Sequence, residues 1–550
     1  MSIRLSFPER ILLAVRSRYT LSKSGWLLLL LGTFIMLLLI SVLRVVWACF
    51  FYPHYRSPLR HLPKPPDRPS PFMGHFWQML AISPGQALRS WVNEVPNAGL
   101  IRYLDLCNLE RVVVTSPAAV AEVLLHRCYD FEKPPHFRKG IARVIGLGLF
   151  TAEGETHKKQ RKHLMPAFAF RHVKNLYPMF WSISKELVAA IFAFAGKTDI
   201  TSSDDCMCIN VAEWSSRAAL DIIGQGGFGE SFNAIQDPDN NLHRTYREIF
   251  APGRTGEIRA VLGFLVPQWV VRRLPFLRND ERECASNLLR SFCRSSIETK
   301  RQQLKTSPAG LIDILTVAMN SSAFSDENLV DQMMTFLAAG HETTASAFTW
   351  AVYLLAKHPQ IQSNLRDQVR SQLPSLSKEP SSIVTSESFE KLSYLYAVCQ
   401  EALRLFPPVA VTFRVAVKDT SICGQSIPKG TTVIIPPWAI NGSEELWGPD
   451  AAEFRPERWQ RKASSSPVDN KGTNYNYLTF LHGPRSCIGQ SFALGELACL
   501  LAAWVDAFET ELQDANYVPV IRGGIAAKPQ DGLFVRLKAA PITVFQGSDG

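Results

Sequence analysis

The sequence lacks several features that would place it in a common class of protein. Its 11 cysteines are scattered, with no CxxC pair and no regular spacing, which argues against a disulfide scaffold and favours a reducing compartment. It contains no internal repeat and no recognised nucleic-acid-binding motif. The formal net charge of +10 therefore suits an anionic membrane surface or an acidic protein partner better than it suits nucleic acid.

Charge is also absent from residues 24–43, which lie between Lys23 and Arg44. An apolar helix of this length spans about 30 Å, the thickness of the hydrocarbon core of a bilayer. Trp26 and Trp47 flank the run, as interfacial aromatic residues often do. We therefore expect a single transmembrane helix. A cleaved signal peptide is the alternative, but it would have a shorter apolar core and a small-residue cleavage site.

The rest of the chain divides around this anchor. Residues 1–23 are basic, residues 44–71 are rich in proline and are interpreted as a stiff linker, and residues 72–550 are expected to form one catalytic domain. Basic residues are nearly balanced on the two sides of the anchor, so they leave its orientation open. The unpaired cysteines favour a catalytic domain in the cytosol.

Hydrophobic periodicity and breaker residues predict a mainly helical domain with small β-sheets. Strands are expected at 111–115 and 431–435, a polar surface loop at 461–475, and helices at 117–127, 325–357, 392–405 and 489–508. In the longest of these helices, Ser325 is the expected N-cap and Pro359 marks the end.

The most specific pattern is F-x-x-G-x-R-x-C-x-G, formed by Phe480, Gly483, Arg485, Cys487 and Gly489. Cys487 falls just before an expected helix, whose N–H groups and dipole stabilise a thiolate. Gly483 permits an unusual turn, and Gly489 lets the backbone approach a flat ligand. Arg485 can bind a carboxylate, and Phe480 can shield the sulfur from water. A structural cysteine beside a turn is the alternative, but it leaves the glycine and arginine spacing unexplained.

This segment resembles the haem-binding loop of the cytochrome P450 superfamily. The resemblance implies a mostly helical, triangular-prism fold with small β-sheets, preceded here by one transmembrane helix. It also implies that Cys487 is the thiolate ligand of the iron in haem b (iron protoporphyrin IX). Phe480, Arg485 and Gly489 would then contact the cofactor.

A second motif supports the resemblance. Glu401 and Arg404 are three residues apart and share one face of an expected helix. Alone, such a pair is usually a surface ion pair. It is followed by Pro-Glu-Arg458-Trp459, which resembles the family's PERF element with tryptophan in place of phenylalanine. The resemblance implies a buried charge network of Glu401, Arg404 and Arg458. This network would hold in place the sulfur loop, which is the segment 480–489 that contains Cys487.

A third motif lies in the middle of the longest helix, where residues 339–344 read A-G-H-E-T-T. The small residues could be a helix-packing seam, or they could leave room for a ligand. The sequence matches the family's oxygen-binding pattern at every position. By that resemblance Glu342 and Thr343 are the catalytic pair, which would relay the protons that O–O cleavage needs.

The family's W-x-x-x-R element is altered in this chain, because His157 precedes Arg161 where tryptophan is usual. The resemblance makes His157, Arg161 and Arg414 candidates for binding the haem propionates, and the charge of His157 is expected to vary with pH. The same helix is basic and could attract an acidic reductase. Its basic residues are Lys158, Lys159, Arg161 and Lys162.

Together these motifs predict a monooxygenase of the endoplasmic reticulum membrane that oxidises a lipophilic small molecule. No flavin domain follows Cys487, so electrons are expected from NADPH through a separate cytochrome reductase, with cytochrome b5 as a second donor. The alternatives are a haem-thiolate isomerase that rearranges peroxides and a non-catalytic haem sensor or binding protein. Neither of these alternatives would need the Glu342–Thr343 pair.

The substrate itself is not specified by these motifs. Segments 133–149, 251–269, 409–413 and 523–527 are apolar or small in character and are expected to face a lipophilic ligand. The PERW element and the sulfur loop resemble those of filamentous-fungal members of the family that act in secondary-metabolite biosynthesis.

Overall fold

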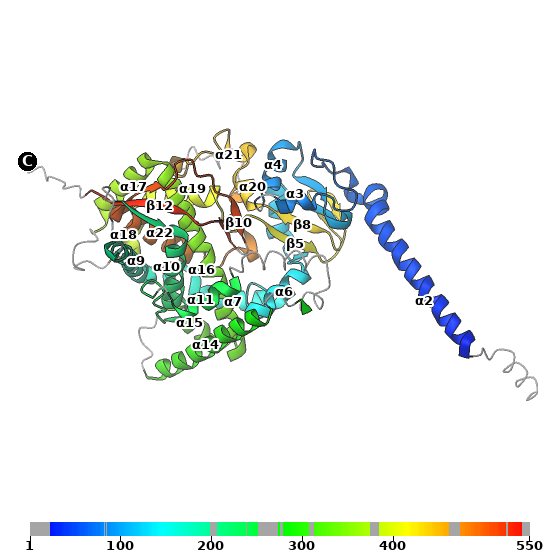
Figure 1. Ribbon diagram of the computed structural model, residues 1–550, viewed down its shortest axis with the longest axis horizontal. Helices are drawn as coiled ribbons and strands as arrows, with labels where there is room; N and C mark the ends of the chain where they lie inside the picture. The colour runs from blue at the N-terminus through cyan, green and yellow to red at the C-terminus, as the bar shows by residue number, and fades with distance from the viewer. Residues whose placement is uncertain are drawn as a thin grey trace, which may run out of the picture.

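The computed structural model describes residues 23–541 except 82, 84, 198–205, 238, 251–272, 275–278, 307–312, 375–383, 461–473 and 524–525. Most of the predicted basic N-terminal segment, most of the loop expected at 461–475 and the segment 251–269 therefore lie outside the described residues. A body of helices occupies one side of the molecule, and a sheet with short helices lies beside the long helix α2 (Figure 1).

The described part of the chain is mainly helical, as the sequence predicted. The α-helices are α2 (Lys23–Val46), α3 (Phe76–Ala81), α4 (Gln86–Glu94), α5 (Pro117–Ala121), α6 (Pro135–Ile145), α7 (Gly154–Phe168), α8 (Phe170–Val173), α9 (Tyr177–Lys197), α10 (Val211–Ile223), α11 (Asn241–Phe250), α14 (Asn279–Thr306), α15 (Ile314–Asn320), α16 (Asp326–Lys357), α17 (Pro359–Gln372), α18 (Ser386–Glu390), α19 (Ser393–Leu405), α20 (Pro437–Asn441), α21 (Glu444–Trp447) and α22 (Gln490–Ala507).

The β component is small and divided among several sheets. The strands are β1 (Leu100–Leu104), β2 (Glu110–Val114), β3 (Phe131–Glu132), β4 (Met207–Asn210), β5 (Thr412–Ala416), β6 (Thr420–Ile422), β7 (Gln425–Ile427), β8 (Thr432–Ile435), β9 (Phe508–Leu512), β10 (Ile521–Gly523), β11 (Ala527–Pro529) and β12 (Phe534–Ala539). The largest sheet has the order β1-β2-β8-β5-β3, in which β2 and β8 are parallel. The others are β4-β12-β9, β10-β11 and β6-β7.

Helix α16 forms the centre of the helical body and packs against α10, α14, α19 and α22. Its start is confirmed as predicted, because the side chain of Ser325 accepts a hydrogen bond from the N–H of Asn328. Most of its residues are buried, so its position is determined from several sides at once. The predicted strands and the remaining predicted helices are confirmed to within a few residues, and 117–127 continues from α5 into a π-helical turn.

The N-terminal helix is longer than predicted. Helix α2 passes into a π-helix, η1 (Trp47–Arg56), so the helical segment continues 13 residues beyond the expected end at residue 43. The rings of Trp47, Phe51 and Tyr55 stack along one side of η1, with neighbouring centroids 5.6 and 6.4 Å apart. Their contacts explain why residues we expected to be an extended linker are helical here.

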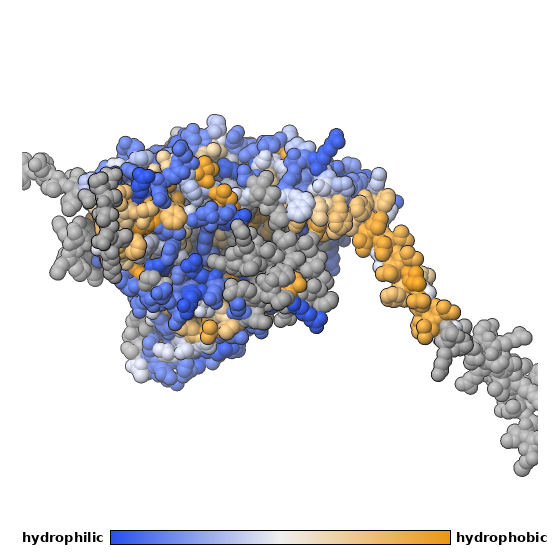
Figure 2. Space-filling view, in the orientation of Figure 1, coloured by the Kyte–Doolittle hydropathy of each residue, from blue (hydrophilic) through white to orange (hydrophobic). Residues whose placement is uncertain are grey.

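The segment after η1 also lies on the domain instead of forming a free spacer. Arg102 donates to the carbonyls of Pro53 and Pro63, and Leu59 is buried in a hydrophobic cluster with β1 and β2. By contrast, the apolar window of α2 and η1 is not buried at all. Figure 2 shows α2 as a hydrophobic rod that projects from a mostly hydrophilic surface. This geometry fits a single transmembrane anchor.

A buried ion pair fixes the end of α14 against α15. Lys300 Nζ lies 3.0 Å from Asp313 Oδ2, and both side chains are almost fully buried. Asp313 also accepts from the N–H of Thr316, which caps α15. The neighbouring Gly229 has φ +71°, and a Cβ there would overlap Lys300 Nζ.

We expect Lys300→Met to lower the free energy of unfolding by about 3–5 kcal/mol, because it leaves the Asp313 carboxylate buried without a counter-ion. Urea unfolding followed by circular dichroism measures the effect. Lys305→Met on the exposed end of the same helix is the control and should change stability by less than about 0.5 kcal/mol. Equal effects of the two substitutions would contradict the role of the ion pair.

Candidate active site

The loop that carries Cys487 is closed by its own backbone. The N–H of Cys487 donates to the carbonyl of Phe480 at 2.8 Å, and the N–H of Ser486 donates to Gly483 at 3.0 Å. Gly483 has φ +71°, and a Cβ there would overlap the carbonyl oxygen of Leu124. The predicted need for glycine at this position is confirmed. At Gly489 a Cβ would meet only Phe168, at 3.7 Å, so no contact within the described protein requires glycine there. That Gly489 makes room for a flat ligand stays a prediction.

Cys487 is an exposed residue, although it lies deep enough in the protein for its thiol to be desolvated. Burial raises the pKa of the thiol, and the N–H of Gly489 and the charge of Arg161 partly oppose this effect. Arg161 donates to Ser486 through two nitrogens, at 2.7 Å to the carbonyl and 3.0 Å to the hydroxyl. In this structure Arg161 therefore contacts the sulfur loop. A metal ion at the sulfur would supply the positive charge that favours the thiolate.

The structure brings together Glu401, Arg404 and Arg458. Glu401 Oε1 accepts from Arg404 Nη2 and Arg458 Nε, each at 2.8 Å, and its Oε2 accepts from Arg404 Nε at 2.9 Å. All three side chains are at most 2% exposed. A buried carboxylate with two guanidinium groups is compensated only in this arrangement, so the network holds α19 against the segment that carries Arg458.

Trp459 belongs to this network, which sequence reasoning did not foresee. Its Nε1 donates to Glu401 Oε2 at 2.8 Å. A phenylalanine at this position could not make this bond. The tryptophan in the PERW element therefore gives the carboxylate an additional donor.

A chain of hydrogen bonds connects this region to the sulfur loop. Arg404 donates to the carbonyl of Asn441 at 2.8 Å. The side chain of Asn441 donates to Thr479 Oγ1 and accepts from the N–H of Leu478, each at 2.8 Å. The next residue, Phe480, accepts from Cys487. The charge network therefore positions both ends of the loop, not only its neighbouring helix.

His157, Arg414 and Arg485 lie together in a buried cluster with Lys133 and Glu153. The N–H of Lys133 donates to Glu153 Oε1 at 3.0 Å, and Arg485 forms an ion pair with the other carboxylate oxygen. Within the described part of the chain, none of the three guanidinium nitrogens of Arg485 makes a well-aligned hydrogen bond, and His157 Nδ1 has no partner. The cluster thus holds several donors suited to an anion.

Burial, together with nearby positive charge, lowers the pKa of three basic groups in this cluster, Lys133, Arg414 and His157. Burial lowers the pKa of Lys133 to about 7, with Arg414 also contributing, and burial and Arg485 lower the pKa of Arg414 to about 10. Burial, followed by Arg485 and Lys133, lowers the pKa of His157 to about 3. His157 is therefore neutral at physiological pH. The prediction that its charge varies with pH is wrong near neutrality for the protein without a ligand.

The A-G-H-E-T-T segment has two distinct faces. A Cβ on Gly340 would come within 2.9 Å of Ile223 Cδ1, so this glycine does serve the packing of α10 on α16. Thr343 Oγ1 donates to the carbonyl of Ala339 at 2.6 Å, and both residues are at least partly exposed. Glu342 is buried and pairs with Lys528 Nζ at 2.8 Å. The side chains of Glu342 and Thr343 therefore have different partners although the residues are adjacent.

Sequence reasoning missed Glu153 and Lys528 as site residues, and it placed Lys133 only at the edge of a substrate-facing segment. Glu153 comes directly before α7, and Lys528 lies in β11 far along the chain. No local pattern marks these three residues, because each joins the site through a contact with a distant segment.

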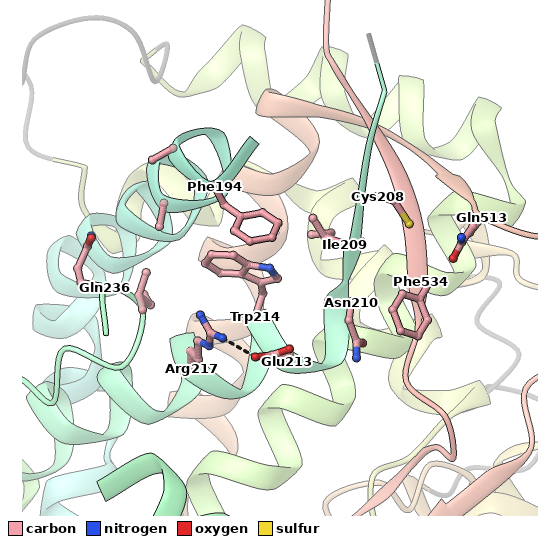
Figure 3. Close-up of a pocket in the computed structure, with 13 residues that line it drawn as sticks. Phe194, Cys208, Ile209, Asn210, Glu213, Trp214, Arg217, Gln236, Gln513 and Phe534 are labelled. Atoms are coloured by element: carbon pink, nitrogen blue, oxygen red, sulfur yellow. Dashed lines mark hydrogen bonds and ion pairs between the residues drawn. The ribbon is translucent and has the colours of Figure 1, made fainter. Parts of the chain in front are cut away.

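A separate surface pocket of about 630 Å³ lies between α9, α10 and the β4-β12-β9 sheet (Figure 3). The rings of Phe194 and Trp214 meet edge to face in it, and Arg217 donates a hydrogen bond to Glu213 at its edge. None of the site residues predicted from the sequence lines this pocket. It is therefore distinct from the region around Cys487.

Comparison with known proteins decides the family. The sequence model of the cytochrome P450 family matches residues 63–535. The chain belongs to the cytochrome P450 family. It is 42% identical over 512 residues to cytochrome P450 monooxygenase sphH of Aspergillus fumigatus, which covers 92% of this chain and 93% of the relative. Cytochrome P450 monooxygenase ALT8 of Alternaria alternata is 41% identical (90% and 92% covered), and FUM15 of Gibberella moniliformis is 38% identical (92% and 92% covered).

The chain is thus a cytochrome P450 monooxygenase. Such enzymes use a haem iron and electrons from a reductase, and they act on lipophilic substrates. The residues present fit a haem: the thiol of Cys487, an exposed residue, suits the iron, and the donors of Arg485 and His157 suit carboxylates. The helix α2 is compatible with a membrane anchor.

Trp459→Phe is expected to lower the free energy of unfolding by about 1–3 kcal/mol, because Glu401 loses one donor to a buried charge. Urea midpoints of the haem-loaded protein measure this. Trp438→Phe is the matched control, since its indole donates to a neutral carbonyl, that of Leu405, and should cost about 0.5–1.5 kcal/mol for that bond. If Trp459→Phe lowered the free energy of unfolding less than Trp438→Phe does, the place of Trp459 in the charge network would be contradicted.

Proposed function

We propose that the protein is a haem b monooxygenase that oxidises a lipophilic small molecule in secondary-metabolite biosynthesis, usually by hydroxylation. The observation that carries this proposal is the buried cluster of Lys133, His157, Arg414 and Arg485, for which the described residues provide one carboxylate, Glu153. Haem b brings two further carboxylates, its propionates. Similarity to monooxygenases of filamentous fungi supports the assignment to secondary metabolism.

In this proposal Cys487 ligates the iron, while Arg485, Arg414, Lys133 and neutral His157 hold the propionates. Phe480 and Gly489 line the proximal side. When bound, a haem with a thiolate ligand activates dioxygen for insertion into a C–H bond. The substrate, O2, two electrons and two protons give the hydroxylated product and one water.

In this proposal Thr343 and Glu342 transfer protons to the bound oxygen. The hydroxyl of Thr343 now donates to Ala339 but can rotate to donate elsewhere, because the residue is only partly buried. Glu342 is an acid held in a largely buried position. A carboxylate and a hydroxyl linked by water can pass protons to an oxygen atom.

Electrons are proposed to come from NADPH through a separate reductase, with cytochrome b5 as a second donor. Lys158, Lys159 and Lys162 on α7 are exposed, whereas Arg161 turns inward to Ser486. The three lysines form a basic face close to the sulfur loop, which an acidic protein would approach quickly. With α2 in the endoplasmic reticulum membrane, we place the catalytic domain on the cytosolic side.

The general test is product formation by membranes containing the protein, with and without reductase and NADPH. The extract of a strain lacking the gene supplies the accumulated candidate substrate. We expect product only when reductase and NADPH are both present. Product formed without any reductant would instead indicate an isomerase.

Cys487→Ala should abolish the characteristic absorption band of the reduced carbon monoxide complex and all monooxygenase activity, because the iron loses its thiolate ligand. Absorption difference spectra measure the band. Cys499→Ala, which removes a fully buried cysteine from α22, the helix that follows the loop of Cys487, is the control and should keep the band. If the band survived in Cys487→Ala, another residue would be the ligand.

Thr343→Ala should uncouple oxygen consumption from product formation, because the variant lacks the hydroxyl that is proposed to donate protons. We expect the product formed per NADPH to fall about tenfold or more, with hydrogen peroxide replacing it. Thr349→Ala is the control, since Thr349 also donates to the carbonyl four residues before it. Unchanged coupling in Thr343→Ala would remove this residue from the proton relay.

A further inference from the structure

The face of α16 that carries Glu342 also binds the C-terminal hairpin β10-β11. Ser346 Oγ and Trp350 Nε1 both donate to the carbonyl of Ala527, at 2.6 and 2.8 Å. Glu342, Ser346 and Trp350 follow one another at four-residue spacing, so they share one face of the helix. Lys528, the next residue of the hairpin, places its Nζ 2.8 Å from Glu342 Oε1.

The backbone that presents Lys528 is fixed from two directions. The carbonyl of Ala527 is held by α16, and its N–H donates to the carbonyl of Pro408 at 2.8 Å. Lys528 is also paired with Arg522 across the antiparallel β10-β11 ladder. The lysine therefore reaches Glu342 from an anchored strand and not from a freely moving surface segment.

The surroundings of Glu342 make this lysine its charge partner. The Glu342 side chain is 5% exposed and that of Lys528 is 29% exposed. Tyr246 on α11 has its pKa raised well above the usual range by burial and by the charge of Glu342. The adjacent His341 has its pKa lowered by burial and by Lys528, so it is neutral. Among the described residues, Lys528 is the cation that forms an ion pair with Glu342.

The ion pair also determines where the carboxylate points. Thr343 Oγ1 bonds within the helix to Ala339, whereas the carboxylate of Glu342 is directed to the hairpin. A proton that passes from Glu342 toward Thr343 must therefore cross from one helix face to the next, through a water molecule or by a turn of the Glu342 side chain. Either route begins from the position that Lys528 imposes.

We propose that Lys528 is a positioning residue for proton delivery, which supplies the counter-ion of the buried Glu342 carboxylate and holds it as a proton acceptor on the hairpin side of α16. The proposal rests on the proposed monooxygenase function and deepens it. Without Lys528, the buried carboxylate has no counter-ion and favours the protonated form. A carboxyl that stays protonated cannot take up the next proton, so delivery slows.

The test compares Lys528→Met, Lys528→Arg, Glu342→Gln and the double variant Glu342→Gln/Lys528→Met. Each full-length, haem-loaded protein is assayed with reductase and NADPH, without added substrate, and the fraction of electrons recovered as hydrogen peroxide or as water is measured. We expect Lys528→Met to lower the yield of water about tenfold and to enlarge the solvent deuterium isotope effect. Lys528→Arg retains the charge and should stay within about threefold of the unsubstituted protein.

The double variant separates positioning from simple structural support. If Lys528 acts through Glu342, the double variant is no worse than Glu342→Gln alone, whereas independent structural effects would multiply. Infrared spectroscopy gives a readout without turnover: a protonated-carboxyl band should appear in Lys528→Met and be missing from the double variant. Ser346→Ala removes one of the two hydrogen bonds to the carbonyl of Ala527, while Trp350 keeps the other and holds the hairpin in place. Arg522→Met removes the cation opposite Lys528. Both should leave the yield of water nearly unchanged.

Multiplying effects in the double variant, or no protonated-carboxyl band in Lys528→Met, would overturn the proposal. An effect of Ser346→Ala equal to that of Lys528→Met would do the same, because hairpin packing alone would then explain the loss. Failure of the monooxygenase function itself is recognised separately. In that case the unsubstituted protein would show neither the thiolate band with carbon monoxide nor reductase-dependent NADPH oxidation.

Discussion

A charged side chain taken out of water must be compensated, and the active site depends on how this chain meets that requirement. Glu401 is fully buried and accepts from Arg404, Arg458 and Trp459. These partners come from two segments of the chain, α19 and the PERW element, and the carboxylate joins them. Because removal of one partner leaves the others uncompensated, the geometry around Cys487 is determined cooperatively and not by its local turn alone.

In the cluster around Arg485, the described protein compensates the buried positive charge only in part. Glu153 is the carboxylate that the described protein offers to Lys133 and Arg485, while His157 stays neutral among the cations. The buried Arg485 donors and the His157 nitrogen have no well-aligned hydrogen-bond partners in the described part of the chain. A ligand carrying carboxylates would supply the missing charge, so folding of this region and cofactor binding are linked.

The sequence predicted features that depend on local patterns. Ser325 begins α16 and Gly483 turns the sulfur loop because capping and positive φ have clear sequence signatures. Helical spacing also predicted that Glu401 meets Arg404, and the family resemblance implied that Arg458 joins them. Contacts between distant segments could not be predicted in this way: Glu153 with Arg485, Lys528 with Glu342, and η1 with the domain. Likewise, only the structure explains why Trp459 replaces phenylalanine, since the reason is a hydrogen bond to a residue 58 positions earlier.

The pairing of Lys528 with Glu342 places a residue of the β10-β11 hairpin in the charge balance of α16. The β10-β11 hairpin belongs to a region expected to face the substrate, where side chains would be free to vary with the ligand. Yet the residue at 528 neutralises an acid on α16, and Ser346 and Trp350 fix the strand that presents it. A neutral residue there would leave a buried carboxylate unpaired whatever substrate is bound. The ion pair with Glu342 therefore limits how the β10-β11 hairpin can change. In the proposed function one strand would serve both the ligand and the charge balance of the central helix.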